Sequence, residues 1–499
     1  MAAVPALPDT LSKNQGSAPP PPPEEQKPPF LATVGTFPRS FWMGCTIEMW
    51  ERLAWYGLRV VLPIYIMQAD EPGGLHFTSA QKGTIYGVWA LVQSLIPMIS
   101  GGFADRYGYK KVLAAYVTIN CTAFIMMANV RSYPMFFASC LLLGFGTALF
   151  KPAIQGTLAQ SLNPKNSSVG WGFFYWLVNV GGMIGPFFAN FLRHNGWQYV
   201  FYGCAAVTSL NYLMLFTYPT VESGADKTKS ISRTAIDTLK NLLDFRLWII
   251  IVIFSGFWMM LYQLWDFMPN FYADWVESSA LSGVLPASWI HDTNRGPQLL
   301  QEYALNVNSF MIVAFVVLMS HLVRKVRVLT AMTAGVLIAT LGTIMYGTSP
   351  SIFVVLFGIV LFSLGEMLTG PKKTEYFALI APKGKKALYL GYLNIPIAIG
   401  QGLGAFISGA YYGKNGEKAT LAMRYLSEHT DYHGAVDRKT SFDTLVKVLG
   451  QDGKAVNQLL WDTYHPYTIW YIFSAIGMCS LVGMIIFSRV SKRWKDMDV

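Results

Sequence analysis

The sequence predicts an all-α polytopic membrane protein of about twelve transmembrane helices in two six-helix bundles. Hydrophobic residues make up 53% of the chain and charged residues only 13%, whereas average soluble proteins have about 25% charged residues. Apolar stretches of spanning length recur along the chain, which argues against a large soluble protein with a big core. Lysine and arginine gather in alternate short loops, as the positive-inside rule expects.

The expected spans fall into two groups of six, separated by the polar stretch 219–245. They are 38–67, 80–103, 110–129, 133–159, 169–192 and 198–218 before that stretch, and 246–274, 304–323, 327–347, 351–380, 387–413 and 465–488 after it. We therefore expect one bundle at 37–218, a cytoplasmic linker at 219–245 and a second bundle at 246–490. Residues 1–36, which include Pro19 to Pro23 in a row, are expected to form a disordered Pro-rich cytoplasmic tail, and residues 491–499 a second cytoplasmic tail.

The positions of lysine and arginine predict that both termini are cytoplasmic. Basic residues gather near both ends of the chain and at Arg106–Lys111, Lys227–Lys240, Arg324–Arg327 and Lys383–Lys386. The other short loops hold few of them, such as Arg131 and Arg193. Two longer loops, 275–303 and 414–464, are therefore expected outside, as lid-like decorations with some helical stretches. The default location is a multi-pass position in the lipid bilayer of the plasma or inner membrane.

Composition also narrows the function classes. The net charge of +10 does not point to nucleic acid, because the basic residues lie in loops between apolar segments. All five cysteines stand in apolar segments and are expected to be small buried hydrophobes. The seven histidines show no metal-ligand spacing, so we expect neither a metal site nor a cofactor. The buried charges lack a nucleophile or metal constellation, so an enzyme is not expected.

The first span carries the ionisable side chains Glu48, Glu51, Arg52 and Arg59 in apolar surroundings. A charge at the bilayer centre costs about 2.5–3.5 kcal/mol on insertion scales, so such groups usually face a protein interior or a wet cavity. Their spacing places them on one stripe of the helix. Lys151 in the fourth span lies at a similar depth, about 12 Å from the inner end. It is a natural partner for Glu48 or Glu51, with a snorkelling lysine as the alternative.

The same depth arithmetic pairs Arg59 with Asp266, because each lies about 20 residues along a span that starts inside. A salt bridge between them would join the two bundles and close an outer gate; a headgroup position for Asp266 is the alternative. Glu366 places an acid of the second bundle near the midplane. Polar side chains at compatible depths are Tyr56, Asn179, Gln263 and Asn308, each of which either contacts a ligand or forms an interhelical hydrogen bond.

These buried charges suggest proton coupling. The proton affinity of a carboxylate depends on its burial and on nearby cations. A conformational change that moves Arg52 or Lys151 would therefore switch the acids of the first span between ionised and protonated forms. Proton uptake would then be coupled to the side on which the cavity opens. Cations facing Glu366 also suit a zwitterion, whose carboxylate and amine would bind opposite charges.

Several motifs resemble the proton-coupled oligopeptide transporter family within the major facilitator superfamily. The run Glu48-x-x-Glu51-Arg52-x-x-x-Tyr56-Gly57 resembles the first-helix signature of this family. The run from Gly101 to Gly108 is similar to a loop of the whole superfamily. Further family matches are Gly146-Thr147-x-x-x-Lys151-Pro152, Phe174-Tyr175-x-x-x-Asn179-x-Gly181, and Gly365-Glu366 with Pro371.

The resemblance implies a major facilitator fold, alternating access and proton-driven import of di- and tripeptides, with the proton as coupling ion. It implies proton-coupling roles for Glu48, Glu51, Arg52 and Lys151. It also implies substrate contacts at Tyr56, Arg59, Asn179, Asn308 and Glu366, and a gate formed by Arg59 and Asp266. Gln263 joins the expected substrate-binding residues on depth alone.

Two other functions stay open at this point. Ala148 stands where the fourth-helix motif has glycine, and Ser309 stands where proline is frequent. The coupling residues are therefore matched more closely than the peptide pocket. The same fold could move another small anion or zwitterion, such as nitrate, an amino acid or a peptide-like metabolite. A non-transporting nutrient receptor is the other alternative, although a pure sensor has no need of the coupling residues.

Overall fold

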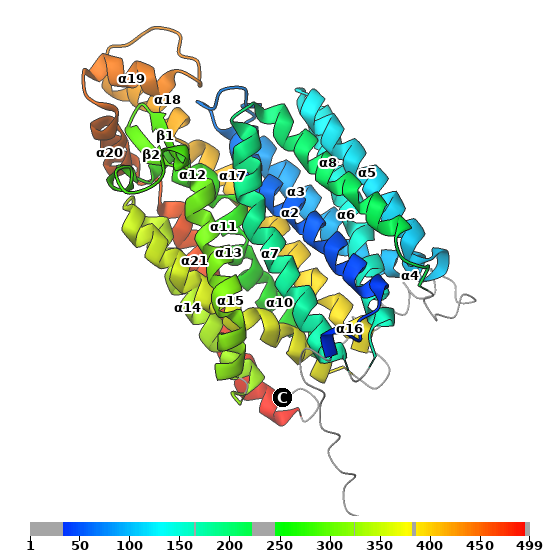
Figure 1. The fold of residues 1–499 in the computed structure, drawn as a ribbon. Helices are drawn as coiled ribbons and strands as arrows, with labels where there is room; N and C mark the ends of the chain where they lie inside the picture. Colours follow the sequence, from blue (N-terminus) through cyan, green and yellow to red (C-terminus); the bar gives the residue numbers. More distant parts are fainter. Residues whose placement is uncertain (1–32, 164–165, 222–244, 324, 382–385, 495–499) are drawn as a thin grey trace, which may run out of the picture.

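The computed structural model describes residues 33–163, 166–221, 245–323, 325–381 and 386–494. Most of the expected N-terminal tail, most of the expected linker and part of the expected C-terminal tail lie outside these residues. We call the described residues before 222 the N half and those from 245 onward the C half. The blue to cyan helices of the N half lie beside the green to red helices of the C half (Figure 1).

The N half consists of helices joined by short connections. They are α2 (Arg39–Met67), α3 (Ser79–Leu95), α4 (Pro97–Tyr107), α5 (Tyr109–Asn129), α6 (Tyr133–Ser161), α7 (Ser167–Arg193) and α8 (Trp197–Phe216). The expected span 80–103 is divided between α3 and α4 at Ile96. Pro97 is the first residue of α4. Because proline has no N–H, it cannot donate a backbone hydrogen bond to the last turn of α3, and the helix is interrupted there.

The long helices of the C half are more often interrupted. They are α10 (Phe245–Leu261), α11 (Gln263–Asp266), α12 (Met268–Trp275), α13 (Gln301–Leu322), α14 (Val328–Thr348), α15 (Ile352–Leu379), α16 (Lys386–Tyr392), α17 (Asn394–Asn415) and α21 (Thr468–Val490). A 3₁₀ turn, η3 (Ser491–Arg493), follows α21. The expected span 246–274 is thus broken at Tyr262 and again at Phe267, just before Pro269. The short α11 between these breaks carries Asp266.

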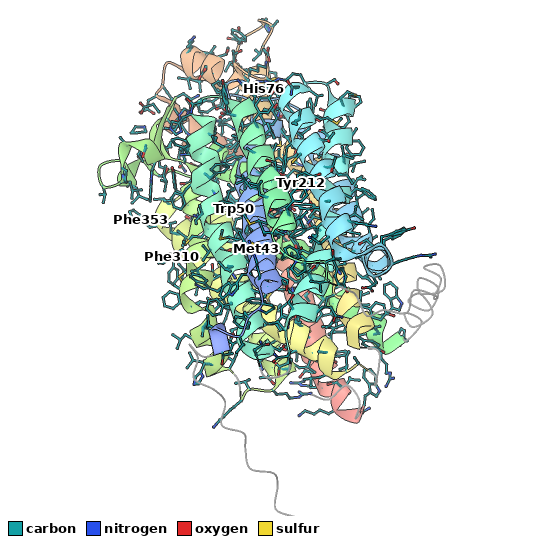
Figure 2. All side chains as sticks on the ribbon, turned by 45° about the vertical axis from the view of Figure 1, so that its right-hand side comes forward. Met43, Trp50, His76, Tyr212, Phe310 and Phe353 are labelled. Atoms are coloured by element: carbon teal, nitrogen blue, oxygen red, sulfur yellow. The ribbon has the colours of Figure 1, made fainter. Side chains whose placement is uncertain are left out.

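Ten helices of the described part are long and apolar enough to cross a membrane, by length and composition alone. The charged α2 and the divided pair α3–α4 lie outside that group of ten, and adding these two crossings gives the twelve that the sequence predicts. Large apolar side chains stand on the exterior, including Phe310 and Phe353, which are 58% and 60% exposed (Figure 2). An apolar exterior of this kind suits contact with lipid rather than water.

The two halves meet where α3 of the N half packs along α17 of the C half. Glycines allow this close approach, because a Cβ atom on Gly83 would lie 2.6 Å from the carbonyl oxygen of Ala405 and 2.9 Å from the Cα of Gly409. Small residues at such helix contacts let two backbones pack closely within a membrane. On the other side of the molecule, Asn306 of α13 donates a hydrogen bond to the carbonyl of Met183 in α7.

The remaining elements form a small cap at one end of the molecule, opposite the C-terminus (Figure 1). It contains two short 3₁₀ turns, η1 (Ser279–Leu281) and η2 (Ala287–Trp289), and a hairpin of β1 (Ile290–Thr293) and β2 (Gly296–Leu299). It also contains α18 (Lys418–His429), α19 (Ser441–Leu449) and α20 (Gly453–Tyr464). We call this end of the molecule the cap end and the other the terminal end.

Candidate functional site

An arginine and two acids form a buried cluster on α2. The Arg52 Nε atom lies 3.3 Å from Glu48 Oε1, and the Arg52 guanidinium also pairs with Glu51. Glu48 is 4% exposed, Glu51 2% and Arg52 6%. One turn of helix brings the three groups together, because Glu48 and Arg52 are four residues apart. Two carboxylates therefore share a single guanidinium in the interior.

Lys151 of α6 lies close to this cluster without joining it. Its ammonium is near enough to interact electrostatically with Glu48, Glu51 and Arg52. Among the described residues, no ion pair joins it to either acid, so the direct pairing that depth suggested is not formed. Both acids are instead paired with Arg52, which lies within one turn of them on the same helix. The Lys151 side chain is exposed although it lies within a span, and its charge is close enough to interact with that of Lys373 in the C half.

Arg59 and Asp266 form an ion pair between α2 and α11, at 1% and 2% side-chain exposure. The Asp266 carboxylate also accepts a hydrogen bond of 3.1 Å from the amide of Gln401 in α17. The Arg59 guanidinium lies over the rings of Trp55 and Tyr262, at 4.7 and 5.3 Å from their centres. The pair is therefore enclosed by aromatic rings, and it joins the N half to the C half.

Lys82 of α3 is a member of this site that the sequence reasoning missed. It is 5% exposed, and its ammonium donates to the carbonyl oxygen of Asp266 and to Asn270 Oδ1, the latter at 2.9 Å. Asn270 in turn donates to the carbonyl of Pro63 in α2. A lysine so near the start of a span usually reaches the membrane interface. Only the packing of α3 against α11 and α12 shows that this one turns inward.

Glu366 of α15 forms the acidic part of a central cavity. Its Oε2 atom accepts a hydrogen bond of 2.9 Å from Asn308 of α13, and Asn308 also donates to Ser363 at 3.0 Å. Glu366 lines a cavity of about 640 Å³ together with Tyr175 of α7, Trp258 of α10 and Lys373. Residues of both halves thus contribute to one cavity near the middle of the spans.

The remaining predicted site residues differ in position. Tyr56 is half-buried, lies edge-on to Trp265 at 5.9 Å and is close enough to Glu366 to interact electrostatically. Asn179 is half-buried on α7 and donates to the carbonyl of Tyr175, a cavity residue one turn earlier. These two residues lie beside the central cavity.

Gln263 differs from the other expected substrate-binding residues in its surroundings, and it is not among the residues that line the cavity of Glu366. It is fully buried, and its amide donates to the carbonyl of Met259 on the preceding turn. The same Nε2 atom lies against Gly404 of α17, where a Cβ would be 2.4 Å away. The break at Tyr262 turns Gln263 toward α17. The depth argument placed Gln263 at the right level of the membrane but could not give this direction.

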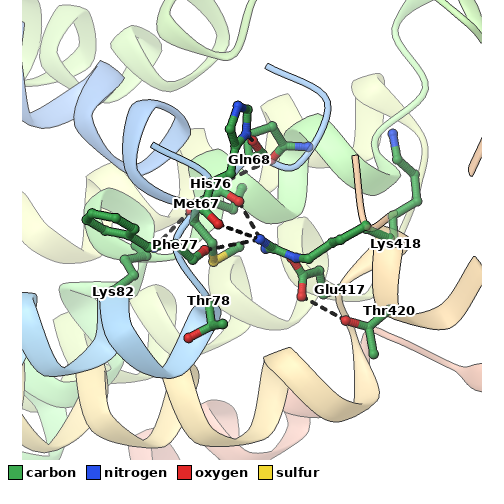
Figure 3. A network of polar contacts seen from close by, with 12 residues as sticks. Met67, Gln68, His76, Phe77, Thr78, Lys82, Glu417, Lys418 and Thr420 are labelled. Atoms are coloured by element: carbon green, nitrogen blue, oxygen red, sulfur yellow. Dashed lines mark hydrogen bonds and ion pairs between the residues drawn. The ribbon is translucent and has the colours of Figure 1, made fainter. Parts of the chain in front are cut away.

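The cap closes over the N half through Arg438, in the connection between α18 and α19. Its guanidinium donates to the carbonyls of His76 at 2.9 Å, Phe77 at 3.3 Å and Met67 at 3.1 Å, and it pairs with Glu417. Figure 3 shows these acceptors converging from Met67 at the end of α2, from the N-half connection 68–78 and from Glu417, just before α18.

Further ion pairs join the halves at the cap end. Arg193 of α7 pairs with both Glu71 and the fully buried Glu302 of α13. Lys418 pairs with Asp70 at 3.2 Å. The protein around Asp70 disfavours its ionisation, but the Lys418 ammonium and a hydrogen bond from Gln68 outweigh this effect and lower its pKa to about 2. In the described part of the chain, three ion pairs join the halves: Arg59–Asp266, Arg193–Glu302 and Lys418–Asp70. Arg59–Asp266 lies deepest, and the other two lie nearer the cap. The structure is therefore closed at the cap end.

A family model of the Major Facilitator Superfamily matches residues 49–290. Among curated relatives, the uncharacterized transporter YclF of Bacillus subtilis is 32% identical over 190 residues, which cover 36% of this chain and 37% of YclF. The peptide transporter YePEPT of Yersinia enterocolitica is 28% identical over 34% of each chain. The multidrug resistance protein MdtH of Klebsiella pneumoniae is 22% identical over 70% of this chain and 81% of MdtH. The matches to YclF and YePEPT span only about a third of those relatives.

Solved structures resemble this one along most of their length. The peptide transporter POT in complex with sulfate has a TM-score of 0.67 at 15% identity, covering 94% of this chain and 99% of that one. A POT family transporter in complex with a thioalcohol-conjugated peptide has a TM-score of 0.64 at 17% identity, covering 93% and 100%. These likenesses confirm the predicted fold class, an all-α polytopic membrane protein of the major facilitator type.

Proposed function

We propose that this chain is a transporter of the major facilitator superfamily, whose family model matches residues 49–290, and that it is a proton-coupled symporter that imports di- and tripeptides by alternating access. A peptide transporter among its relatives and POT family transporters among its structural neighbours support the resemblance to oligopeptide transporters that the motifs predicted. The observation that carries the proposal is the arrangement of two separate acidic groups, Glu48–Glu51–Arg52 on α2 and Glu366–Asn308 at the cavity. Tyr56 is close enough to interact electrostatically with both groups.

Charge counting around α2 supports proton coupling. Glu48 and Glu51 share the single guanidinium of Arg52, so the cluster carries one surplus negative charge when both acids are ionised. A surplus charge in a buried site is costly. Either a proton on one acid or a closer approach of Lys151 would remove it. Both helices belong to the N half, so this approach is a shift of α6 against α2 within that half. If the shift accompanies the change between the two states, the proton is no longer needed, and its release becomes coupled to the conformational change.

A zwitterionic substrate fits the distribution of charge in the cavity. The Glu366 carboxylate, held by Asn308, suits a protonated amine, whereas Lys151 or Arg59 suits the carboxylate by charge complementarity. Tyr56 and Asn179 lie beside the same cavity and are proposed as further substrate contacts. A solved relative in complex with a thioalcohol-conjugated peptide supports a peptide as the substrate class.

Alternating access follows from where the two halves are joined. The structure is closed at the cap end by Arg59–Asp266, Arg193–Glu302 and the Arg438 network. We propose that Arg59 and Asp266 act as an outer gate, that the cap end faces outside and that both termini are cytoplasmic. The distribution of basic loops supports this orientation and a plasma-membrane location. In that orientation the structure is the inward-facing state of an importer.

The test is uptake of labelled dialanine by purified protein in liposomes, with and without an inward proton gradient. Unlabelled tripeptides, single amino acids and nitrate serve as competitors. The proposal expects accumulation that requires the gradient and that small peptides alone block. A gradient-independent equilibration of dialanine would contradict proton coupling but not peptide transport.

A second candidate keeps the fold and the coupling but changes the substrate. Two comparisons favour it. The relative MdtH is a multidrug resistance protein, and one structural neighbour is a POT family transporter in complex with 5-aminolevulinic acid. Uptake of such a solute in place of dialanine, under the same gradient, would establish it. Binding of a peptide without any transport would instead indicate a nutrient receptor.

A further inference from the structure

The central cavity contains a cation that the mechanism above does not use. Lys373 follows Glu366 by seven residues on α15, which corresponds to two turns and about 10 Å along the same face of the helix. Both side chains line the cavity of about 640 Å³, next to Trp258 and Tyr175. The cavity therefore presents an acid and a cation at a defined separation, with the cation nearer the terminal end.

The Lys373 side chain has a defined position but no counter-ion among the described residues. Its Nζ atom lies 3.7 Å from the centre of the Trp258 ring, a cation–π contact that orients an ammonium without giving it a counter-ion. Among the described residues it has no carboxylate within ion-pair distance, and Glu366 attracts it only at longer range. The adjacent Lys372 differs, because it is buried and pairs with Glu375 at 3.0 Å.

Lys151 reaches the same region from the N half. It also lacks a carboxylate partner in the described part of the chain, because Arg52 holds both nearby acids. The charges of Lys151 and Lys373 are close enough to repel each other. Because α6 and α15 belong to different halves, any closure of the terminal end that brings these helices together raises this repulsion.

We propose that Lys151 and Lys373 together bind the carboxylate of the substrate, one lysine from each half, and that this bound carboxylate allows the terminal end to close. The inference rests on the proposed function and adds a residue to its binding site. Arg59 is occupied by Asp266 in this state, and its side chain is 1% exposed. Lys373 in the cavity and Lys151 beside it have no carboxylate partner among the described residues, so both can bind a substrate carboxylate. Glu366 binds the amine.

The spacing of these groups also predicts the length of substrate. An extended chain spans about 3.3–3.6 Å per residue, so a tripeptide extends roughly 10 Å. This length matches the rise from Glu366 to Lys373 along α15. A dipeptide is shorter, and the flexible Lys373 side chain would have to leave the Trp258 ring to reach its carboxylate.

Binding of trialanine and of trialanine amide to the purified full-length protein tests the inference. The variants are Lys373→Met, Lys373→Arg and, as a matched control on the same helix, Lys372→Met. We expect Lys373→Met to weaken trialanine binding about tenfold or more, since it loses a hydrogen bond between charged groups. Binding of the amide should change less than about twofold in Lys373→Met, and the Arg variant should retain most of the affinity for the acid.

The possible outcomes separate the inference from the function on which it rests. If Lys373→Met weakens the acid and the amide equally, Lys373 has a structural role and the inference is wrong. If trialanine binding is unchanged, or falls equally in Lys372→Met, the inference is also wrong. If the unaltered protein binds neither compound, the proposed peptide function fails first and the inference fails with it.

Discussion

Arg59 of α2 and Asp266 of α11 form a buried ion pair across the two halves, while the carbonyl oxygen of the same Asp266 accepts a hydrogen bond from Lys82 of α3. One residue of the C half therefore holds two cations of the N half. The contact lies between the central cavity and the cap. Opening at the cap end must break it, which gives a direct way to shift the balance between the two states.

Replacing Asp266 with Asn should favour the state that is open at the cap end. The substitution leaves Arg59 buried without its carboxylate, whereas the backbone carbonyl that Lys82 binds is retained. Removing one partner of a buried pair costs about 3–5 kcal/mol. Distances between spin labels on the connection 68–78 and on α18 should lengthen. The control is Asp462→Asn on the exposed face of α20. Unchanged distances in Asp266→Asn would exclude the ion pair as a determinant of closure.

Replacing Lys151 with Ala should abolish gradient-driven uptake but allow exchange of substrate across the membrane. Without Lys151, the surplus negative charge of Glu48 and Glu51 can be removed only by a proton, so the proton stays bound through the cycle. Accumulation in liposomes should fall to the level without a gradient, while counterflow continues. Lys447→Ala, on the exposed surface of α19, is the control for loss of one positive charge. Normal concentrative uptake by Lys151→Ala would refute the coupling assignment.

Arg438 should be needed to hold the cap on the N half. Its guanidinium binds three backbone carbonyls and Glu417 at once, so Arg438→Ala should destabilise this closure by about 1.5–3 kcal/mol. Faster hydrogen exchange in residues 65–78 measures the effect. Lys cannot reproduce the planar fork of arginine, so Arg438→Lys should rescue little. Arg424→Ala, which removes an exposed pair with Glu428 on α18, should leave exchange in 65–78 unchanged.

The Asp70–Lys418 pair should not respond to pH in the range where proton-driven transport is measured. The pKa of Asp70 is lowered to about 2, below the ordinary value of about 3.9. The pair therefore stabilises the closed cap end fully above about pH 4 and is lost only as the pH falls toward 2. Asp70→Asn should change the rate of uptake but leave the midpoint of its pH profile between pH 5 and 8 in place. A shifted midpoint would show that Asp70 takes part in proton coupling.

Much of the site was predictable because a membrane span restricts what a charged side chain can do. Glu48, Glu51, Arg52, Arg59, Lys151 and Asp266 stand out in the sequence as charges within apolar stretches. The rise of a helix then gives their depth, and matching depths placed Arg59 level with Asp266. The fold class followed from the same physics, since the lengths and spacing of the apolar stretches determine the number of crossings.

Depth alone does not give direction around a helix axis or the choice between competing partners. The break at Tyr262 turns Gln263 into the contact with Gly404, and the proximity of Arg52 leaves Lys151 without an acid. Lys82 and Lys373 stand near span ends, where a lysine normally reaches water. Hydrogen bonds to α11 and α12 hold Lys82 inside, and the ring of Trp258 holds Lys373. The sequence by itself thus determined which charges stand well inside a span and at what level. The tertiary structure decided which of them meet, because that depends on the rotation and breaks of each helix against its neighbours.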